Sequence, residues 1–330
     1  MALVSANKLT LVDAAKRRDP DGSMAMIAEM LQQTNTVIED GVYVEANGEL
    51  IHRTTYRTGL PSGTWRPVNK GIQPSKSTSA QATEIMSMLD DLSIIDTRIL
   101  RWQRDADAFR ASEDMAFIMG FAQEMAAQAF YGTATPAAPE EGFLGLHQRF
   151  NDSTANNARN IRDHGDALTL TSAYITTWGE QTCHFIHPPN TPAGIEIDVM
   201  PVDLVNDDQT PAGQYRAART YFSWTMGMCV RDWRYCGRVA NINANGLDDS
   251  STATLIQELI EVRTMIQDGR YGSPVCYLNR ELKGKIDGYA QRKGNVYLSM
   301  GEWAGQPTTM LQDMPLRVND AIANDEPVYA

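Results

Sequence analysis

The sequence is poor in cysteine and in long apolar runs, and each shortage excludes a class of protein. The four cysteines among 330 residues form no C-x-x-C pair, so we expect reduced thiols rather than a disulfide framework: Cys183, Cys229, Cys236 and Cys276. The longest apolar run, residues 115–122, is far short of the roughly 20 residues that cross a membrane. Residues 1–18 hold no secretory signal. We therefore expect synthesis in the cytoplasm and no membrane partner.

Basic residues are also in short supply. With 29 Lys and Arg against 41 Asp and Glu, the net charge is −12. Proteins that bind nucleic acid over a whole surface usually carry a basic excess, because phosphate neutralisation supplies most of their affinity. The chain is nevertheless 42% hydrophobic, which provides enough apolar surface for a folded core. These values favour a globular protein of about two domains that is not a dedicated DNA or RNA binder.

The motifs of common enzyme chemistries are missing. The sequence has no G-x-x-x-x-G-K-[ST] loop, no G-x-G-x-x-G turn, no G-x-S-x-G elbow, no H-E-x-x-H pair and no EF-hand loop. A nucleotide site, a serine-hydrolase site and a zinc-protease site therefore have no support.

The strongest enzyme candidate is Cys183, with His184 and His187 close behind it. A reactive thiolate needs a base or a cation beside it. Neighbouring residues of a strand point to opposite faces, so Cys183 and His184 would not share one. We expect a buried cysteine with surface histidines, and a zinc site on Cys183 and His187 would lack a second pair of ligands. A cytosolic hydrolase or binding enzyme using Cys183 and His187 stays the alternative.

Two further patterns have a chemical and a structural interpretation. The acidic loop at Asp203, Asn206, Asp207 and Asp208 could hold a divalent cation for such an enzyme, although solvated turns have the same composition. The aromatic and arginine-rich stretch 215–235 could stack single-stranded nucleic acid. Its alternation and the acidic balance of the chain favour packing in a sheet instead.

The most regular segment is residues 105–131, where apolar residues recur at spacings of three and four. Gly132 follows and suits the end of a helix. Four acids crowd its first turns, where the helix dipole favours anions: Asp105, Asp107, Glu113 and Asp114. The pattern predicts a long helix with one acidic end.

A polar, extended segment covers residues 42–88. Asn47-Gly48 predicts a hairpin turn, and extended stretches follow at about 50–57 and 75–88. Residues 46–76 contain five basic side chains and one acid, a net charge of +4 in a chain of −12. Such a segment is too polar to bury a face against its own chain. We expect a basic hairpin that lies on a neighbouring copy, and a solvated surface hairpin is the alternative.

The other segments alternate between short helices and strands. Residues 9–18 and 23–34 predict two small helices, and residues 133–141 a linker. Further helices are expected at 252–266 and 279–292. Strands are expected at 167–178, 183–187, 195–205, 214–228, 231–242, 296–298 and 308–318. No βαβ repeat is present, so the fold class is α+β.

Five groups of residues together resemble one family, the major capsid proteins of tailed bacteriophages with the Hong Kong 97 type fold, podovirus-like members above all. The similarity spreads over almost the whole chain. The residues that carry it are 5–17 with 19–22; 52–55, 57–62, 65–66 and 71–78; 109–110, 112–114 and 130–132; 230–235 and 238–242; and 305–307 with 313–315.

The resemblance implies an architecture. It divides the chain into an N-terminal arm (1–41), an extended loop hairpin (42–88), a peripheral domain with a long spine helix (89–144, plus returning strands in 306–330) and a mixed α/β axial domain (145–305). The extended loop lies over an adjacent subunit in this family. The contacts then expected between subunits join the acids of the long helix to residues of the hairpin: Arg53, Arg57, Trp65, Arg66, Lys70 and Lys76.

The resemblance also implies a structural function without catalysis, cofactor or metal. The chain would self-assemble through pentamers and hexamers into an icosahedral virion shell around double-stranded DNA, which it would not bind sequence-specifically. Scaffolding, portal and cement or decoration proteins are the expected partners. Lys70 and Lys76 lie in the loop where some members form covalent cross-links, but no partner for one is evident here, so we expect non-covalent stabilisation.

Overall fold

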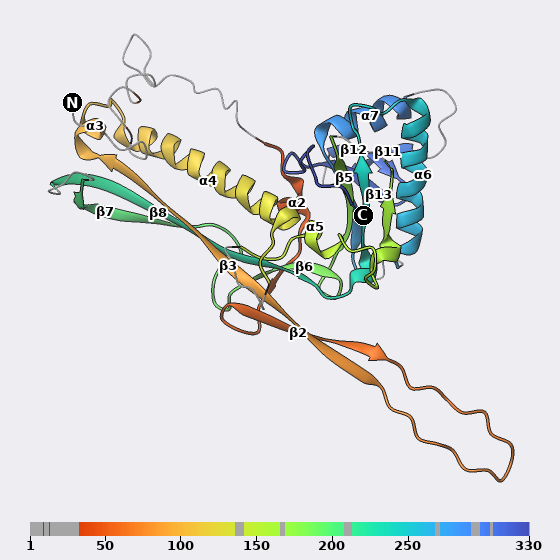
Figure 1. Ribbon diagram of the computed structural model, residues 1–330. Helices are drawn as coiled ribbons and strands as arrows, with labels where there is room; N and C mark the ends of the chain where they lie inside the picture. Colours follow the sequence, from red (N-terminus) through yellow and green to blue (C-terminus); the bar gives the residue numbers. More distant parts are fainter. Residues whose placement is uncertain are drawn as a thin grey trace. The chain divides into compact units, whose positions relative to one another are not determined.

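The computed structural model describes most of the chain (Figure 1). The described residues are Leu9, Asp13, 33–135, 142–165, 169–207, 213–267, 271–291, 298–303 and 306–329. They form two compact units, and β3, α4 and β8 contribute residues to both. The first unit comprises Met1–Gln33, Met88–Met125 and Pro192–Thr225, and the second comprises Thr34–Ser87, Ala126–Thr191 and Met226–Ala330. No described helix is long and apolar enough to cross a membrane.

The second unit is built on a mixed β-sheet. Its centre is β5 (Thr171–Trp178), which pairs antiparallel with β10 (Ser273–Leu278) and with β9 (Cys236–Ile242). On one side, β10 runs parallel to β13 (Met314–Val318). On the other side, β6 (Cys183–His187) pairs antiparallel with the end of β8 (Gln214–Val230). Nearly every residue of β5, β9 and β10 is buried, which explains their continuous apolar and threonine-rich composition.

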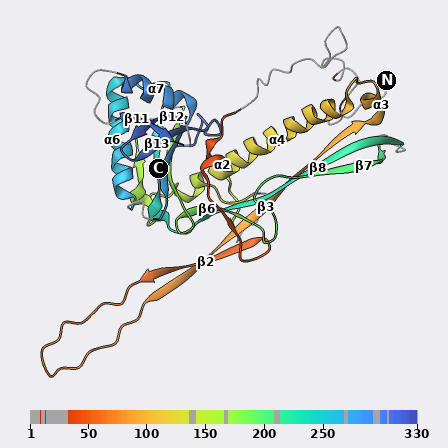
Figure 2. The same ribbon diagram turned by 180° about the vertical axis from the view of Figure 1, so that it is seen from behind.

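Two helices complete this core. They are α6 (Asp249–Met265) and α7 (Arg280–Ala290), and both views show them beside the sheet (Figures 1 and 2). A side chain caps the start of each helix. The Asp248 carboxylate accepts a hydrogen bond from the Ser251 N–H, and the Asn279 side-chain oxygen accepts one from the Leu282 N–H; each bond is 2.8 Å long. The core cluster includes Leu255, Leu259 and Val262 of α6, packed on the buried residues of β5, β9, β10 and β13.

Shorter elements complete the second unit. They are α2 (Thr36–Asp40), β1 (Tyr43–Glu45), α5 (Leu146–Arg149), η1 (Ala158–Asn160), β4 (Ile161–Asp163), η2 (Trp233–Tyr235), β11 (Leu298–Trp303) and β12 (Gln306–Leu311). β11, β12 and β13 form an antiparallel meander, and β1 and β4 extend the sheet as parallel partners of β6 and β9.

A buried ionic cluster holds the C-terminal segment on this sheet. Glu326 accepts hydrogen bonds from Arg238 (2.8 Å), Tyr131 (2.6 Å) and Ser172. Arg238 is fully buried, and its guanidinium also donates to the Phe150 carbonyl over 2.9 Å. Burial alone would raise the pKa of Glu326, but the hydrogen bonds and the Arg238 charge lower it to about 2.

The hairpin of the second unit consists of β2 (Ile51–Gly59) and the first part of β3 (Thr78–Asp96). Their antiparallel register runs from Ile51↔Ile85 to Gly59↔Thr78, with an irregularity beyond Arg57. Figure 1 shows residues 60–77 as a long open loop that joins the two strands.

The first unit combines helices with a two-stranded ribbon. Its elements include α3 (Thr97–Arg101), most of α4 (Ala106–Tyr131), the end of β3, and β7 (Glu196–Asn206) paired antiparallel with β8. Ile95, Ile99 and Phe109 form a small core. The Phe117 ring of α4 stacks on Phe222 of β8 at 5.2 Å with an interplanar angle of 4°.

Most predicted elements are confirmed, and the differences have local causes. The predicted turn at Asn47-Gly48 joins no hairpin, because β1 pairs in parallel with β6 instead of with β2. The predicted strand 231–242 begins only at Cys236: the Asp232 carboxylate accepts from the Arg234 N–H over 3.0 Å and turns the chain. The central strand β10 was not predicted. The predicted helix 23–34 and linker 133–141 lie largely outside the described residues, as does 9–18 apart from Leu9 and Asp13.

Candidate functional site

The root of the hairpin is fixed to the rest of its unit, contrary to the expectation that it buries no face. His52, Thr54, Glu84 and Met86 are buried there. Both carboxylate oxygens of Glu84 accept hydrogen bonds from the Arg149 guanidinium, with lengths of 2.8 and 2.7 Å, and this ion pair is largely buried. Arg149 lies on α5 and therefore fastens β3 to the body of the second unit.

Gly227 of β8 allows a close approach of β3 at this root. A Cβ at that position would lie only 2.5 Å from the Ile85 carbonyl oxygen. Since that atom belongs to the backbone, a larger residue would displace the hairpin strand. The root is thus both ion-paired and tightly packed.

The loop at the other end of the hairpin has the opposite character. Every residue from 60 to 77 is exposed, and the Trp65 side chain is fully so at 101%. Leu60, Val68 and Ile72 are also exposed apolar side chains in this loop. Monomeric proteins rarely gather exposed apolar residues in this way without a partner to cover them.

The basic residues of the hairpin accompany this apolar group. All five are exposed, and within the described part of the chain none of them forms an ion pair: Arg53, Arg57, Arg66, Lys70 and Lys76. Arg66 donates to the Lys70 carbonyl over 2.7 Å, around a turn where Asn69 has a positive φ of 70°. The sequence therefore identified a set of exposed cations without ion pairs among the described residues, together with a fully exposed tryptophan.

The four acids predicted on the long helix occupy different environments in the first unit. Asp105 accepts from the Ala108 N–H over 3.0 Å at the start of α4, and Asp107 is exposed. Glu113 is partly exposed. Asp114 accepts from the Thr220 hydroxyl over 3.2 Å, and burial raises its pKa despite that bond. Asp114 is therefore directed at its own chain.

A groove of about 400 Å³ lies between β3 and α4 in the first unit. Its floor is apolar and includes Phe117 and Phe121, while Asp90, Asp91 and Glu124 are exposed around it. This groove was not predicted from the sequence, because Asp90 and Asp91 are far from Glu124 along the chain. The adjacent acids Asp90 and Asp91, which follow an alternating strand pattern, were the sequence feature that could have indicated it. The groove offers an anionic rim around an aromatic surface.

The residues of the alternative enzyme site are not arranged for catalysis. Cys183 is fully buried, and burial raises the pKa of its thiol well above the ordinary value. His187 lies four residues further along β6, roughly 13 Å away in an extended strand. The expectation of surface histidines is wrong for His184, which is 1% exposed because β6 is covered on both faces.

The acidic loop and the aromatic stretch are engaged within the chain. Asp207 accepts from the Gly213 N–H over 2.7 Å, and Asp203 pairs with Arg219 at 3.1 Å; Asp208 lies outside the described residues. Trp224 and Tyr235 are buried, and Arg234 pairs with Asp232 at 2.6 Å. Structural packing therefore accounts for these patterns.

Comparisons with known proteins point to one family. The family model described as "Major capsid protein GP7" matches residues 19–329. A chain in the structure of bacteriophage Epsilon15 is 31% identical over 100% of both chains, with a TM-score of 0.76. No curated protein matches the sequence.

Two further solved structures are more distant. The capsid of Myoviridae phage XM1 is 9% identical (66% of this chain and 95% of that one, TM-score 0.44). The SrpI encapsulin from Synechococcus elongatus is 10% identical (71% and 96%, TM-score 0.43). The full-length match and the family model confirm the resemblance stated from the sequence: this chain belongs to the GP7 family of phage major capsid proteins, structural subunits of the Hong Kong 97 type fold that form the icosahedral shell of a tailed phage and are not enzymes.

Proposed function

We propose that the hairpin is the device by which each shell subunit holds a neighbouring copy. Residues 60–77, with Arg53 and Arg57 on β2, lie on the first unit of an adjacent subunit. Trp65 or another apolar side chain of the loop enters the groove between β3 and α4 there. The basic side chains then face Asp90, Asp91 and Glu124.

One observation carries this proposal: the loop exposes four large apolar residues and leaves its cations without ion pairs among the described residues. Exposed apolar area and solvated charge contribute nothing to the stability of a lone subunit. They contribute once a partner surface of opposite charge removes them from water. The groove supplies both properties, an aromatic floor and an acidic rim.

The acids at the start of α4 form a second, weaker candidate for the partner surface. Asp105 and Asp107 are exposed and could face the cations at the edge of such a contact. Asp114 is the least suited of the predicted acids, because Thr220 of its own chain already donates to it. The groove is favoured over these residues since it also accommodates apolar side chains.

The family supports a wider assignment of regions. In its terms, residues 1–41 are the N-terminal arm, 42–88 the extended loop, 89–144 with 306–330 the peripheral domain that contains the spine helix α4, and 145–305 the axial domain. The shell would assemble from pentamers and hexamers with the help of scaffolding and portal proteins, and cement proteins would decorate it. The net charge of −12 suits a wall that does not retain packaged DNA.

Charge reversal with a compensating partner tests the contact. The variant R53E/R57E should remain folded, with an unchanged circular dichroism spectrum, while its yield of particles in electron micrographs falls at least tenfold. Adding D90K/D91K to the same chain restores complementary charge across the contact and should recover particles. Lys285→Glu is the matched control, because Lys285 is an exposed cation on α7.

Particle yield also depends on salt if the contact is exposed, since charges are screened over about 10 Å at 0.1 M ionic strength. Normal particles from R53E/R57E would contradict the charge contact. Recovery by D105K/D107K but not by D90K/D91K would place the hairpin on the start of α4 instead of in the groove.

A further inference from the structure

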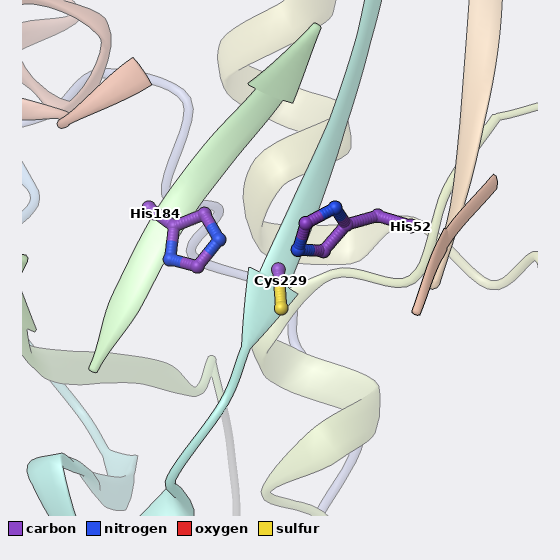
Figure 3. A group of neighbouring side chains, drawn as sticks. All are labelled: His52, His184 and Cys229. Atoms are coloured by element: carbon purple, nitrogen blue, oxygen red, sulfur yellow. The ribbon is translucent and has the colours of Figure 1, made fainter. Parts of the chain in front are cut away.

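Three side chains of the second unit meet at the root of the hairpin. His52 comes from β2, His184 from β6 and Cys229 from β8, and Figure 3 shows them directed toward one another. One ligand atom from each lies within 4.8 Å of the other two. The two imidazole rings stand edge to face, with centroids 5.8 Å apart and an interplanar angle of 88°.

His184 is the unusual member of this group. It is 1% exposed, and neither of its ring nitrogens makes a hydrogen bond of normal geometry among the described residues, although the Gly179 backbone lies close enough to act on its pKa. A buried polar group without a partner destabilises the fold, typically by about 1–3 kcal/mol. A cation bound between the rings would satisfy one of these nitrogens.

Burial favours metal binding at the two histidines and opposes it at the cysteine. Burial disfavours the charged form of both rings: it lowers the pKa of His184 to about 4 and also lowers that of His52. Burial raises the pKa of the Cys229 thiol to about 12. Binding at Cys229 therefore forms a metal–sulfur bond and releases the thiol proton to solvent.

We propose that His52, His184 and Cys229 form a buried binding site for a d¹⁰ metal ion that takes nitrogen and sulfur ligands, Cu⁺ or Zn²⁺. Imidazole and thiolate together select such ions over Mg²⁺ or Ca²⁺, which take oxygen ligands. The nearby carboxylate of Glu84 has both oxygens occupied by Arg149 and cannot serve as a fourth ligand. The set of three ligands therefore favours Cu⁺. Its complex with one thiolate and two imidazoles is neutral, which suits a site where the positive charge of nearby Arg231 already acts on both histidines.

Binding requires a small contraction of the group. Zn–N and Zn–S bonds of about 2.0 and 2.3 Å place tetrahedral ligand atoms about 3.5 Å apart, so the present group must close by about 1 Å. The bond from the Asn47 N–H to Nδ1 of His52, a long one at 3.3 Å, must also be given up. The ion would draw β2 toward β6 and β8 and fasten the hairpin at its root.

Metal titration of the full-length chain tests the site. Purified protein, stripped with a chelator and reduced, is titrated separately with Cu⁺ under anaerobic conditions and with Zn²⁺, each against a colorimetric chelator. We expect one equivalent per chain, tighter for Cu⁺ than for Zn²⁺. Less than about 0.1 equivalent of either ion would overturn the proposal.

Two variants and two controls locate the bound ion. Cys229→Ala and His184→Gln should each weaken binding at least about 100-fold, because even the loss of an outer-shell partner costs 10–100-fold. Cys276→Ala and His187→Gln should bind like the wild type, since neither residue belongs to the group. Equal binding by the wild type and Cys229→Ala would overturn the assignment.

A measurement on the wild type covers the case in which the variants do not fold. The bound ion should slow alkylation of Cys229 at least tenfold in partially denaturing urea, as read by mass spectrometry of the peptide. The thiol of Cys276 serves as the internal reference. Equal protection of both cysteines would show general stabilisation without ligation and would contradict the site.

Discussion

Arginine occupies two opposite environments in the second unit. Arg238 is fully buried between β5, β9 and the C-terminal segment, and it donates to Ser172, Glu326 and the Phe150 carbonyl. Arg57, at the far end of the hairpin, is exposed and makes no ion pair within the described residues. The residue type is the same, but the first serves the fold of one chain and the second does not.

The difference between buried Arg238 and exposed Arg57 distinguishes residues that stabilise the single chain from residues available for contacts between chains. A buried charge that loses its partner is costly, whereas an exposed charge contributes little wherever it stands. Substitutions in the buried cluster should therefore change the free energy of unfolding of a single chain. Substitutions at the hairpin tip should change only what the chain does with its neighbours.

The largest effect is expected for Arg238→Ala. It leaves the Glu326 carboxylate buried without its cation, which typically costs about 3–5 kcal/mol. Urea unfolding of the unassembled chain, followed by circular dichroism, measures the change. Arg162→Ala is the matched control, because its pair with Glu261 at 3.0 Å is partly exposed and should contribute about 0–1 kcal/mol. Similar losses in the two variants would end the distinction between buried and exposed arginines.

Acid should weaken the same cluster in the wild type. The pKa of Glu326 is lowered from 4.5 to about 2, so this carboxylate stabilises the folded state fully above about pH 4.5. As the pH falls toward 2, that contribution of about 3 kcal/mol is lost, because the unfolded chain binds the proton more readily. Unfolding curves between pH 5 and pH 2 measure the slope. Glu326→Gln should have a shallower slope there, and an unchanged slope would refute the assignment.

A smaller loss is expected at the hairpin root. Glu84→Gln removes the charge that pairs with Arg149 and should cost about 2–3 kcal/mol. Because the pair joins β3 to α5, amide hydrogen exchange should also rise in β2 and β3 before it rises in β5 or β10. Gln81→Ala, at an exposed position on the same strand, is the control and should leave both measurements unchanged. Uniform exchange through the whole unit would show that the pair stabilises the core and not the root.

The sequence predicts those elements of the fold that are determined by neighbouring residues, and it fails for those determined by distant partners. The helix α4 is correct to within a residue, because its periodicity and the following glycine are local signals. Strand β10 was missed: its short apolar run between Pro274 and Asn279 has no period that separates strand from helix. The prediction of a hairpin turn at Asn47-Gly48 was wrong, because β1 pairs with β6, a strand far along the chain.

The candidate site divides in the same way. The exposed cations were identified from the local charge balance, and Trp65 was identified from the resemblance to the capsid family. The groove and the buried group of His52, His184 and Cys229 bring together residues from distant parts of the chain. Spacing along the sequence does not show which distant residues meet, and only the packing of the elements reveals it.

The smallest effect on folding, and the sharpest test of the comparison, is expected for Trp65→Ala. Its side chain touches nothing that its removal could disturb, so the free energy of unfolding should change by less than about 0.5 kcal/mol. Particle yield should nevertheless fall severalfold, because exposed tryptophans are typical anchors of interfaces. Met300→Ala, at another exposed apolar residue outside the hairpin, should leave both quantities unchanged. Normal assembly of Trp65→Ala would mean that the loop 60–77 is solvated in the shell. Easier unfolding of the variant would mean that the loop packs on its own chain. Either outcome would show that the contrast between the two arginine environments does not separate assembly from stability.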